Sequence, residues 1–305
     1  MNTATADRPV IDVQHVTRTY KDVTALDDVS FSIAENTICG LLGRNGAGKT
    51  TLMQLLTGQE FPSSGDIRVA GRNPVENTDV LQQLCFIKES QKYPESFQAR
   101  HVLASAPWFF SGWDADFADE LVAQFRLPLK RDIKKLSRGQ LSALGVTVGL
   151  ASRAPITFFD EPYLGLDAVS RQYFYDTLLA DYAEHPRTIV LSTHLIDEVS
   201  NLLEHVLVFE QGKLLIDQDA ESLRGRATAV AGQAGAIDRF AEGREVLHRD
   251  TLGGLATVTL AGQLTAEDRR VASAAGLEVT TVSLQQLIVD LSRSVSSQPV
   301  AERVS

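Results

Sequence analysis

Residues 43–50 read GRNGAGKT, and this stretch fits the phosphate-binding pattern G-x-x-x-x-G-K-[ST] at every defined position. The apolar run at residues 37–42 suits a buried strand, and residues 51–56 suit the first turns of a helix. Glycines let successive backbone N–H groups point at a phosphate, and the helix N-terminus adds a partial positive charge. The stretch therefore predicts an α/β fold in which a strand, a phosphate-binding loop and a helix follow one another.

The residues of this loop indicate how a nucleotide is held. Lys49 is expected to reach the terminal phosphates, and Thr50 offers a hydroxyl to Mg²⁺. Because the loop backbone faces the phosphates, the whole stretch contributes to the candidate binding site. Its members are Gly43, Arg44, Asn45, Gly46, Ala47, Gly48, Lys49, Thr50 and Thr51.

Four further motifs follow in chain order. They read LSRGQ at 136–140, ITFFDE at 156–161, LGLD at 164–167 and STH at 192–194. One such motif alone is a weak signal, whereas the ordered set is specific. Together with the phosphate loop, the set resembles the ATP-binding subunit of an ABC (ATP-binding cassette) transporter over about residues 10–226.

The resemblance implies the fold and the cofactors. It implies a P-loop NTPase of the ABC cassette type, with a mixed sheet core, a β-subdomain and a helical subdomain at about residues 97–150. The short apolar strands at 157–159 and 188–191 agree with this, since they are typical of a parallel sheet covered on both faces. It also implies an ATPase that binds ATP and Mg²⁺ and closes with a second ATPase subunit over two ATP molecules.

Two acids and a histidine stand where catalytic groups are expected. Asp160 ends the apolar run at 156–159, so its carboxylate lies at the C-terminal edge of a parallel sheet, where it suits Mg²⁺ directly or through a water. By resemblance, Glu161 is the general base that polarises the attacking water. The same resemblance makes His194 a contact of the γ-phosphate that helps to order this water. We therefore expect Glu161, His194 and Lys49 to carry the catalysis.

The resemblance also assigns the remaining nucleotide contacts. Tyr20 is expected to stack on adenine. Ser137, Gly139 and Gln140 form an anion site at a helix N-terminus, which closes over the ATP of the opposite subunit. Asp167 would lie at the seam between the two subunits.

One position departs from the family pattern. Family members usually carry a glutamine after the strand that follows the phosphate-loop region, where it reaches the metal and senses the membrane partner. Here Glu89 takes that position, and Gln91 is the alternative if the loop shifts. Glu89 can offer one oxygen to Mg²⁺ but adds negative charge near the phosphates. The expected metal ligands are thus Thr50, Asp160 and Glu89.

Composition narrows the class of protein. The chain has 305 residues and a net charge of −10, which argues against a general nucleic-acid binder, so no nucleic-acid partner is expected. Its two cysteines, Cys39 and Cys85, are too few for a disulfide framework and fit a reducing cytoplasm. Residues 1–9 hold no apolar stretch of the kind found in a secretory signal, and no run reaches the ~18 apolar residues that span a bilayer. A membrane role therefore requires a separate partner, with this chain cytoplasmic and peripheral on the inner face of the cell membrane.

The composition shifts near Arg226, which predicts two domains: the ABC ATPase domain at 1–226 and a small α+β domain at 227–305. In the second we expect a β-α-β-β-α-β order, the ferredoxin-like pattern. The expected elements lie at 228–231, 236–241, 245–248, 256–260, 266–275 and 278–282. A last helix is expected at 284–291 and a polar, frayed end at 296–305.

The aromatic stretch WFFSGW at residues 108–113 has two interpretations. It is either the small core of the helical subdomain or a groove that receives a cytoplasmic helix of a membrane subunit. The amino-acid sequence around it resembles that of ATPase subunits of bacterial exporters whose transmembrane permease is a separate polypeptide. These include multidrug, antibiotic-resistance and lipid-export systems. An importer subunit is a variant of this hypothesis, and the second ATPase subunit is either another copy or a paralogue.

Two other classes of protein remain as alternatives. A soluble ABC ATPase that acts on ribosomes or DNA is the first, although ribosome-acting members usually hold two cassettes and this chain has one phosphate loop. A small-molecule kinase with a phosphate loop is the second. It would not need residues 136–140 or His194, so it ranks last.

Overall fold

The computed structural model describes residues 9–89 and 91–289. The chain forms two compact units. The first holds the residues up to Leu195 together with Leu202–Asp217, and the second holds Ile196–Asn201 and the residues from Gln218 onward. A hydrophobic core cluster lies in each unit.

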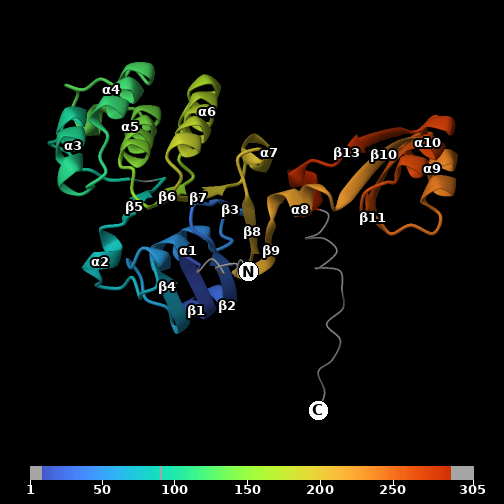
Figure 1. Cartoon of the computed structure of the whole chain (residues 1–305), viewed down its shortest axis with the longest axis horizontal. Helices are drawn as coiled ribbons and strands as arrows, with labels where there is room; N and C mark the ends of the chain where they lie inside the picture. Colours follow the sequence, from blue (N-terminus) through green and yellow to red (C-terminus); the bar gives the residue numbers. More distant parts are fainter. Residues whose placement is uncertain (1–8, 90, 290–305) are drawn as a thin grey trace, which may run out of the picture. The chain divides into compact units, whose positions relative to one another are not determined.

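A six-stranded sheet forms the centre of the first unit (Figure 1). In sheet order its strands are β5 (Leu84–Ile87), β6 (Ile156–Asp160), β7 (Thr188–Thr193), β3 (Ile38–Gly43), β8 (His205–Glu210) and β9 (Lys213–Asp219). Neighbouring strands from β5 to β8 run parallel. Every residue of β6 and β7 is buried, as predicted for apolar strands covered on both faces. The carboxyl ends of β3, β6 and β7 therefore meet at one edge of the sheet, where the candidate site lies.

A three-stranded antiparallel sheet packs beside this core. Its strands lie in the order β2 (Val23–Ile33), β1 (Ile11–Tyr20) and β4 (Ser64–Val69). Buried and more exposed side chains alternate along much of β1 and β2, so the sheet buries one of its faces. The helix α1 (Lys49–Leu56) buries Leu52, Met53, Leu55 and Leu56 in the same core cluster. This packing fixes the first turn of α1 directly behind the phosphate loop.

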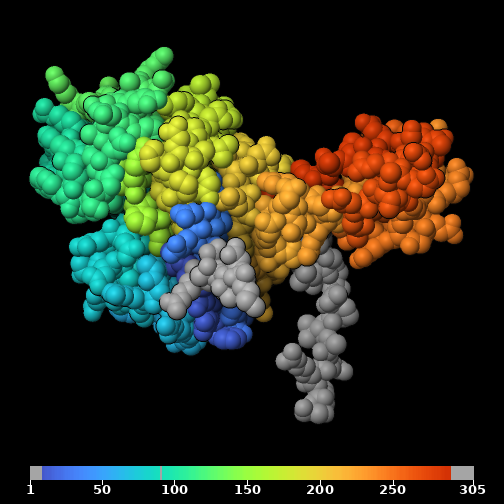
Figure 2. Space-filling view, in the orientation of Figure 1, coloured from blue at the N-terminus to red at the C-terminus, as the bar shows by residue number. Residues whose placement is uncertain are grey.

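The stretch expected to be helical consists of several short helices. They are α3 (Ala99–Ser105), the 3₁₀ turn η1 (Ala106–Trp108), α4 (Ala115–Gln124), the 3₁₀ turn η2 (Ile133–Lys135) and α5 (Arg138–Ala151). Pro107 lies in η1, just after α3 ends, and Gly112 lies between η1 and α4, because proline lacks the N–H that a helix interior needs and glycine weakens a helix. The remaining helices are α2 (Thr78–Leu81), α6 (Ala168–Glu184) and α7 (Ile196–Val199). The surface is hollowed where the cyan segment with α2 meets the teal segment with α3 (Figure 2).

The second unit has its own antiparallel sheet, with helices before and between its strands. Besides α7, its elements are α8 (Ala220–Arg224), β10 (Ala227–Gln233), α9 (Ala234–Ala241), β11 (Val246–Leu252), β12 (Leu255–Ala261), α10 (Ala266–Ala274) and β13 (Glu278–Thr281). The strands lie in the order β11, β12, β10 and β13. Residues 284–289 are helical as predicted, and the rest of that expected helix lies outside the described residues. The frayed end expected at 296–305 lies outside them as well.

Candidate active site

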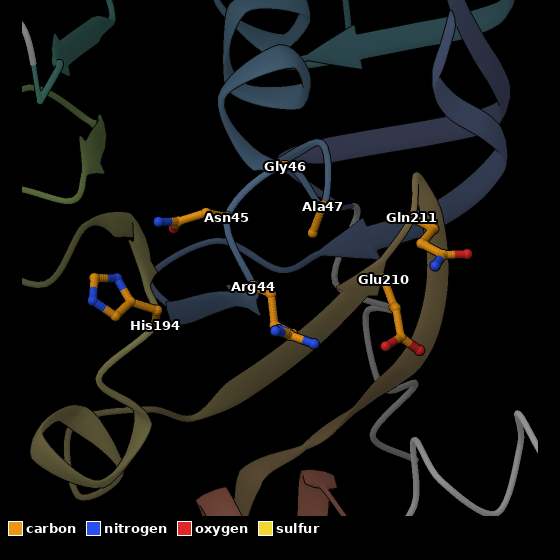
Figure 3. A pocket seen from close by; sticks show the side chains of 7 residues that line it. All are labelled: Arg44, Asn45, Gly46, Ala47, His194, Glu210 and Gln211. Carbon is orange, nitrogen blue, oxygen red and sulfur yellow. The ribbon is translucent and has the colours of Figure 1, made fainter.

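The phosphate loop lies between β3 and α1 and lines a cavity of about 460 Å³ (Figure 3). His194 reaches this cavity from the segment after β7, and the turn between β8 and β9 closes another side. The lining residues are Arg44, Asn45, Gly46, Ala47, His194, Glu210 and Gln211. The sheet edge thus brings the predicted loop and the predicted histidine to one cavity, although 143 positions separate Thr51 from His194 in the chain (194 − 51).

The loop needs glycine where it meets α1. Gly48 has a φ of 104°, a left-handed conformation that suits glycine, and a Cβ there would lie 2.6 Å from the Ala25 carbonyl oxygen. Gly48 is also the N-cap of α1, and no side chain caps this helix N-terminus. The first N–H groups of α1 are therefore free of a side-chain acceptor and suit an anion.

Lys49 folds back over its own loop. Its Nζ donates to the Gly43 carbonyl at 2.7 Å and to the Arg44 carbonyl at 3.2 Å, and the residue is only 6% exposed. A buried ammonium needs such acceptors, because removing it from water without partners is costly. A phosphate oxygen would be a stronger, charged acceptor for the same group.

Asp160 lies at the end of β6 and accepts two hydroxyl hydrogen bonds. Thr50 Oγ1 donates to Oδ2 at 2.7 Å, and Ser192 Oγ donates to Oδ1 at 2.6 Å. The carboxylate is 3% exposed, so these bonds offset much of its loss of hydration. The structure thus brings Thr50 and Asp160 together as an oxygen-rich pair. Ser192 is an addition, since it was part of the STH motif but carried no role in the sequence analysis.

Glu161 follows in a strained backbone conformation. Its φ is 49°, in the left-handed region that non-glycine residues rarely adopt, at a cost of roughly 1–2 kcal/mol. The Glu161 N–H donates to the Ser192 side chain at 3.1 Å, which helps to hold this geometry. Strain of this kind persists only where neighbouring contacts determine the conformation, and it is typical of functional sites.

The Glu161 side chain lies among three partners. His194 Nδ1 lies 2.8 Å from Oε2, the Tyr163 hydroxyl also bonds Oε2, and Lys49 Nζ lies 3.5 Å from Oε1. Oε1 is buried and receives no hydrogen bond from any described residue, Lys49 included. One carboxylate oxygen is therefore anchored, and the other faces the lysine of the phosphate loop.

Tyr163 was missed by the sequence analysis. It is 2% exposed, and its hydroxyl also accepts from Thr193 Oγ1 at 2.9 Å and from the His194 N–H at 3.2 Å. Burial, and next the hydrogen bond with Glu161, raise the pKa of this phenol, so it keeps its proton and remains a donor. The available signal was a tyrosine two positions after the acid, a residue type that needs a hydrogen-bond partner when buried.

The LSRGQ motif begins α5 with a complete capping box. Ser137 Oγ accepts from the Gln140 N–H at 3.2 Å, and Gln140 Oε1 accepts from the Ser137 N–H at 3.1 Å. Gly139 packs closely on the next loop, since a Cβ there would lie 2.4 Å from the Gly165 carbonyl oxygen. Ser137 and Gly139 thus belong to a rigid helix start that is packed against the LGLD segment.

Asp167 and Tyr20 take defined positions in the same unit. Asp167 caps α6 by accepting from the Ser170 N–H at 2.8 Å, and this backbone bond lowers the pKa of its carboxyl. Tyr20 ends β1 with a ring that is 37% exposed, and the Arg18 guanidinium lies 4.3 Å from the ring centre. Both side chains are accessible for the contacts that the resemblance assigns to them, and those roles stay predictions.

Glu89 and Arg138 form an ion pair, and both residues line a second cavity. Arg138 Nη2 donates to Glu89 Oε1 at 2.6 Å, which joins the segment after β5 to the LSRGQ motif. Glu89, Gln91 and Glu161 all line the adjoining cavity of about 450 Å³. The metal-ligand role predicted for Glu89, with Gln91 as the alternative, stays a prediction.

Both cysteines are buried free thiols. Burial raises the pKa of the Cys39 thiol and raises that of Cys85 to about 12, so neither is a reactive thiolate at neutral pH. Within the described residues, no helix combines the length and the apolar character that a bilayer crossing needs.

Comparison with known proteins gives a consistent result. A family model described as ABC transporter matches residues 26–164. The doxorubicin resistance ATP-binding protein DrrA of Mycobacterium tuberculosis is 31% identical, over 72% of this chain and 69% of its own length. The bacitracin transport ATP-binding protein BcrA of Bacillus licheniformis is 28% identical, over 71% of this chain and 72% of its own.

A solved structure shows the same fold. It is the dimeric post-hydrolysis state of the ATP-binding cassette MJ0796 bound to ADP and Pi, with 20% sequence identity. The match covers 69% of this chain and 98% of that one, with a TM-score of 0.61. The first unit therefore has the P-loop ABC cassette fold, and the resemblance to this family is confirmed. The chain belongs to the ABC transporter family, as an ATP-binding and ATP-hydrolysing subunit.

Proposed function

We propose that ATP is hydrolysed at the edge of the six-stranded sheet, with Lys49, Glu161 and His194 as the catalytic groups. Lys49 and the loop N–H groups hold the terminal phosphates, and electrostatic positioning supplies most of the rate acceleration. Glu161 polarises the attacking water, and His194 contacts the γ-phosphate. The observation that carries this proposal is the buried cluster in which Glu161 lies 2.8 Å from His194 and 3.5 Å from Lys49.

Thr50 and Asp160 would hold Mg²⁺, with Glu89 as the further predicted ligand. The fit rests on their chemistry: a hydroxyl and a carboxylate already lie 2.7 Å apart, and Mg²⁺ prefers oxygen ligands. When bound, the ion neutralises charge on the phosphate oxygens. The protein contributes the fixed Asp160 carboxylate, which Ser192 orients from the opposite side.

We also propose that two ATPase subunits enclose each nucleotide. Ser137, Gly139 and Gln140 of one subunit contact the ATP that Lys49 of the other binds, and Asp167 lies at the seam. The capping box at Ser137 supports this, because it fixes the position of the N-terminus of α5, and the helix dipole at this end favours an anion. The similar MJ0796 cassette is a dimer. Tyr20 would complete the site by stacking on adenine.

The membrane partner would dock in an apolar groove of about 670 Å³ between α2 and the α3–η1 segment. Trp108 is 83% exposed and Phe109 is 68% exposed at its rim, and side chains of this kind gathered on a surface favour a binding role. Within the aromatic stretch at 108–113, Trp108 and Phe109 are exposed and Phe110 and Trp113 are half-buried, which favours the groove over the core interpretation. We propose that a cytoplasmic helix of a transmembrane permease fills this groove. The chain would then be cytoplasmic and peripheral on the inner face of the cell membrane.

The cargo is proposed to be a drug, an antibiotic or a lipid. DrrA is a doxorubicin resistance protein and BcrA is a bacitracin transport protein, and both share the cassette with this chain. Cargo contacts lie in the permease, so the cassette itself does not select among these compounds.

For residues 227–305 we propose a ferredoxin-like accessory domain that follows an ATPase domain at 1–226. The order β10-α9-β11-β12-α10-β13 and the antiparallel strand order β11-β12-β10-β13 support this proposal.

Affinity capture from detergent-solubilised native membranes tests the exporter proposal. The full chain is expected to retain a multi-span membrane protein in near-stoichiometric yield. A Trp108→Ala/Phe109→Ala chain should lose that protein, whereas a Leu252→Ala chain should keep it, since Leu252 is 85% exposed in the other unit. Capture of ribosomal or DNA-bound partners, with no membrane protein, would contradict the proposal.

A further inference from the structure

Tyr163 lies at the centre of the catalytic cluster, yet neither the phosphate-loop chemistry nor the cassette motifs need a tyrosine there. Its hydroxyl contacts Glu161, Thr193 and both the backbone and the ring of His194. The ring is buried against the His194 imidazole, with 5.8 Å between the ring centres. A single hydroxyl therefore links the proposed base to the segment that carries the proposed γ-phosphate contact.

The number of protons on each group determines which atom donates in the hydrogen bonds around Tyr163. The Tyr163 oxygen accepts from the Thr193 hydroxyl and from the His194 N–H, so its own single proton is available for Glu161 Oε2. An ionised carboxylate only accepts, so the His194 Nδ1 that lies 2.8 Å from Oε2 donates to it as well. Both donors therefore act on Oε2.

The other carboxylate oxygen of Glu161, Oε1, differs from Oε2 because no hydrogen bond from the described part of the chain holds it. Oε1 is buried and receives no hydrogen bond from the described residues, and Lys49 Nζ lies 3.5 Å away. A general base needs a free lone pair directed at the water beside the phosphate. Anchoring Oε2 leaves Oε1 as the oxygen with that lone pair.

We propose that Tyr163 is a positioning residue that fixes Glu161 through Oε2, so that Oε1 serves as the base oxygen. The same hydroxyl ties the base to His194, so the two groups move together. This inference rests on the proposed role of Glu161 as the base. It adds a residue whose contribution is made through the carboxylate and not by contact with ATP.

The test compares two tyrosines in the full chain. Tyr163→Phe keeps the buried ring and removes the hydroxyl. Tyr182→Phe is the matched control, because the Tyr182 hydroxyl also bonds a carboxylate, Glu204 Oε2 at 2.7 Å, away from the site. Y163F is expected to lower kcat for MgATP by about 10–100-fold, the usual cost of losing a group that orients a reacting residue, with KM unchanged. Y182F should keep the wild-type kcat. A wild-type kcat in Y163F, or an equal fall in both variants, would overturn the proposal.

A double variant shows whether Tyr163 acts through Glu161. In single turnovers with excess chain, E161Q/Y163F is expected to hydrolyse ATP at the same slow rate as E161Q, because the residue that the tyrosine positions has already lost its basic oxygen. A further fall by the factor seen for Y163F alone would overturn the inference. Wild-type turnover in E161Q would instead refute the base, and with it both proposals. Normal turnover in Y163F beside an inactive E161Q refutes only the role of Tyr163.

Thermal unfolding would reveal whether Y163F fails to fold. In that case another variant tests the same proposal. Thr193→Val removes a hydroxyl that donates to the Tyr163 oxygen and leaves the ring in place. It is expected to lower kcat with KM unchanged, by less than Y163F would. No change in kcat would count against the positioning role.

Discussion

Lys49 carries a positive charge that the fold buries almost completely. Two loop carbonyls and the nearby Glu161 carboxylate hold it in place. Charge-assisted bonds to phosphate would replace bonds to neutral carbonyls, so nucleotide binding gains from the exchange. The two bonds from Lys49 also tie its side chain to the backbone of the phosphate loop.

Replacing Lys49 by alanine should weaken ATP binding. A hydrogen bond to a charged group contributes about 1.5–3 kcal/mol, so the Kd for ATP should rise roughly 10–100-fold. Isothermal titration of K49A measures this, with Lys130→Ala as the control, since Lys130 is exposed in the helical part. An unchanged Kd in a folded K49A chain would show that the loop N–H groups alone hold the phosphates.

Single residues were predictable from the sequence where their chemistry is encoded locally. Lys49 and Asp160 stand next to a loop or a strand end that the sequence itself reveals. Tyr163 was not predictable, because its function depends on a contact with His194, which lies 31 positions further along the chain. The ion pair between Glu89 and Arg138 was hidden for the same reason, with 49 positions between the partners.

At the scale of elements, polar contacts at helix starts determine where helices begin. Ser137 caps α5 and Thr265 caps α10, and each cap is a capping box that the following turn completes. In α10, Asp268 closes the box and also pairs with Arg244. These bonds, those from Thr265 first, lower the pKa of the Asp268 carboxyl to about 2.

This shift predicts a pH dependence for the stability of the second unit. Because the folded pKa lies below the ordinary value of 3.8, the contribution is fully present above pH 3.8 and is lost as the pH falls toward about 2. Urea unfolding of wild type and Asp268→Asn should therefore differ at about pH 5 and converge near pH 2. Asp250→Asn serves as the control, because its side chain is 79% exposed. A difference that stays constant with pH would contradict the prediction.

Helices and strands were predictable from the sequence where their apolar residues follow a clear pattern. The apolar runs at β6 and β7 and the helix at α10 were visible in the sequence. β11 was expected at 245–248, whereas the strand runs Val246–Leu252. Its second half, Arg249 to Leu252, is exposed on an edge strand and pairs with β12 through backbone bonds that do not depend on apolar alternation.

At the scale of the whole molecule, the two compact units are not two uninterrupted stretches of the chain, because each unit takes residues from two stretches. The segment Ile196–Asn201 closely follows His194 in the chain, yet it belongs to the second unit. There Asp197 accepts from the Gln285 N–H at 3.3 Å. The composition shift near Arg226 could not reveal this grouping, because it depends on contacts between distant parts of the chain.

The central claim is that this chain hydrolyses ATP with Glu161 as the base. The most direct test is the steady-state rate of MgATP hydrolysis by the full chain and by Glu161→Gln, with ATP binding measured on the same samples. Removing a general base costs about 10²–10⁴-fold, so E161Q should lose turnover by that factor while it binds ATP as tightly as wild type. Near-wild-type hydrolysis by E161Q would contradict the account.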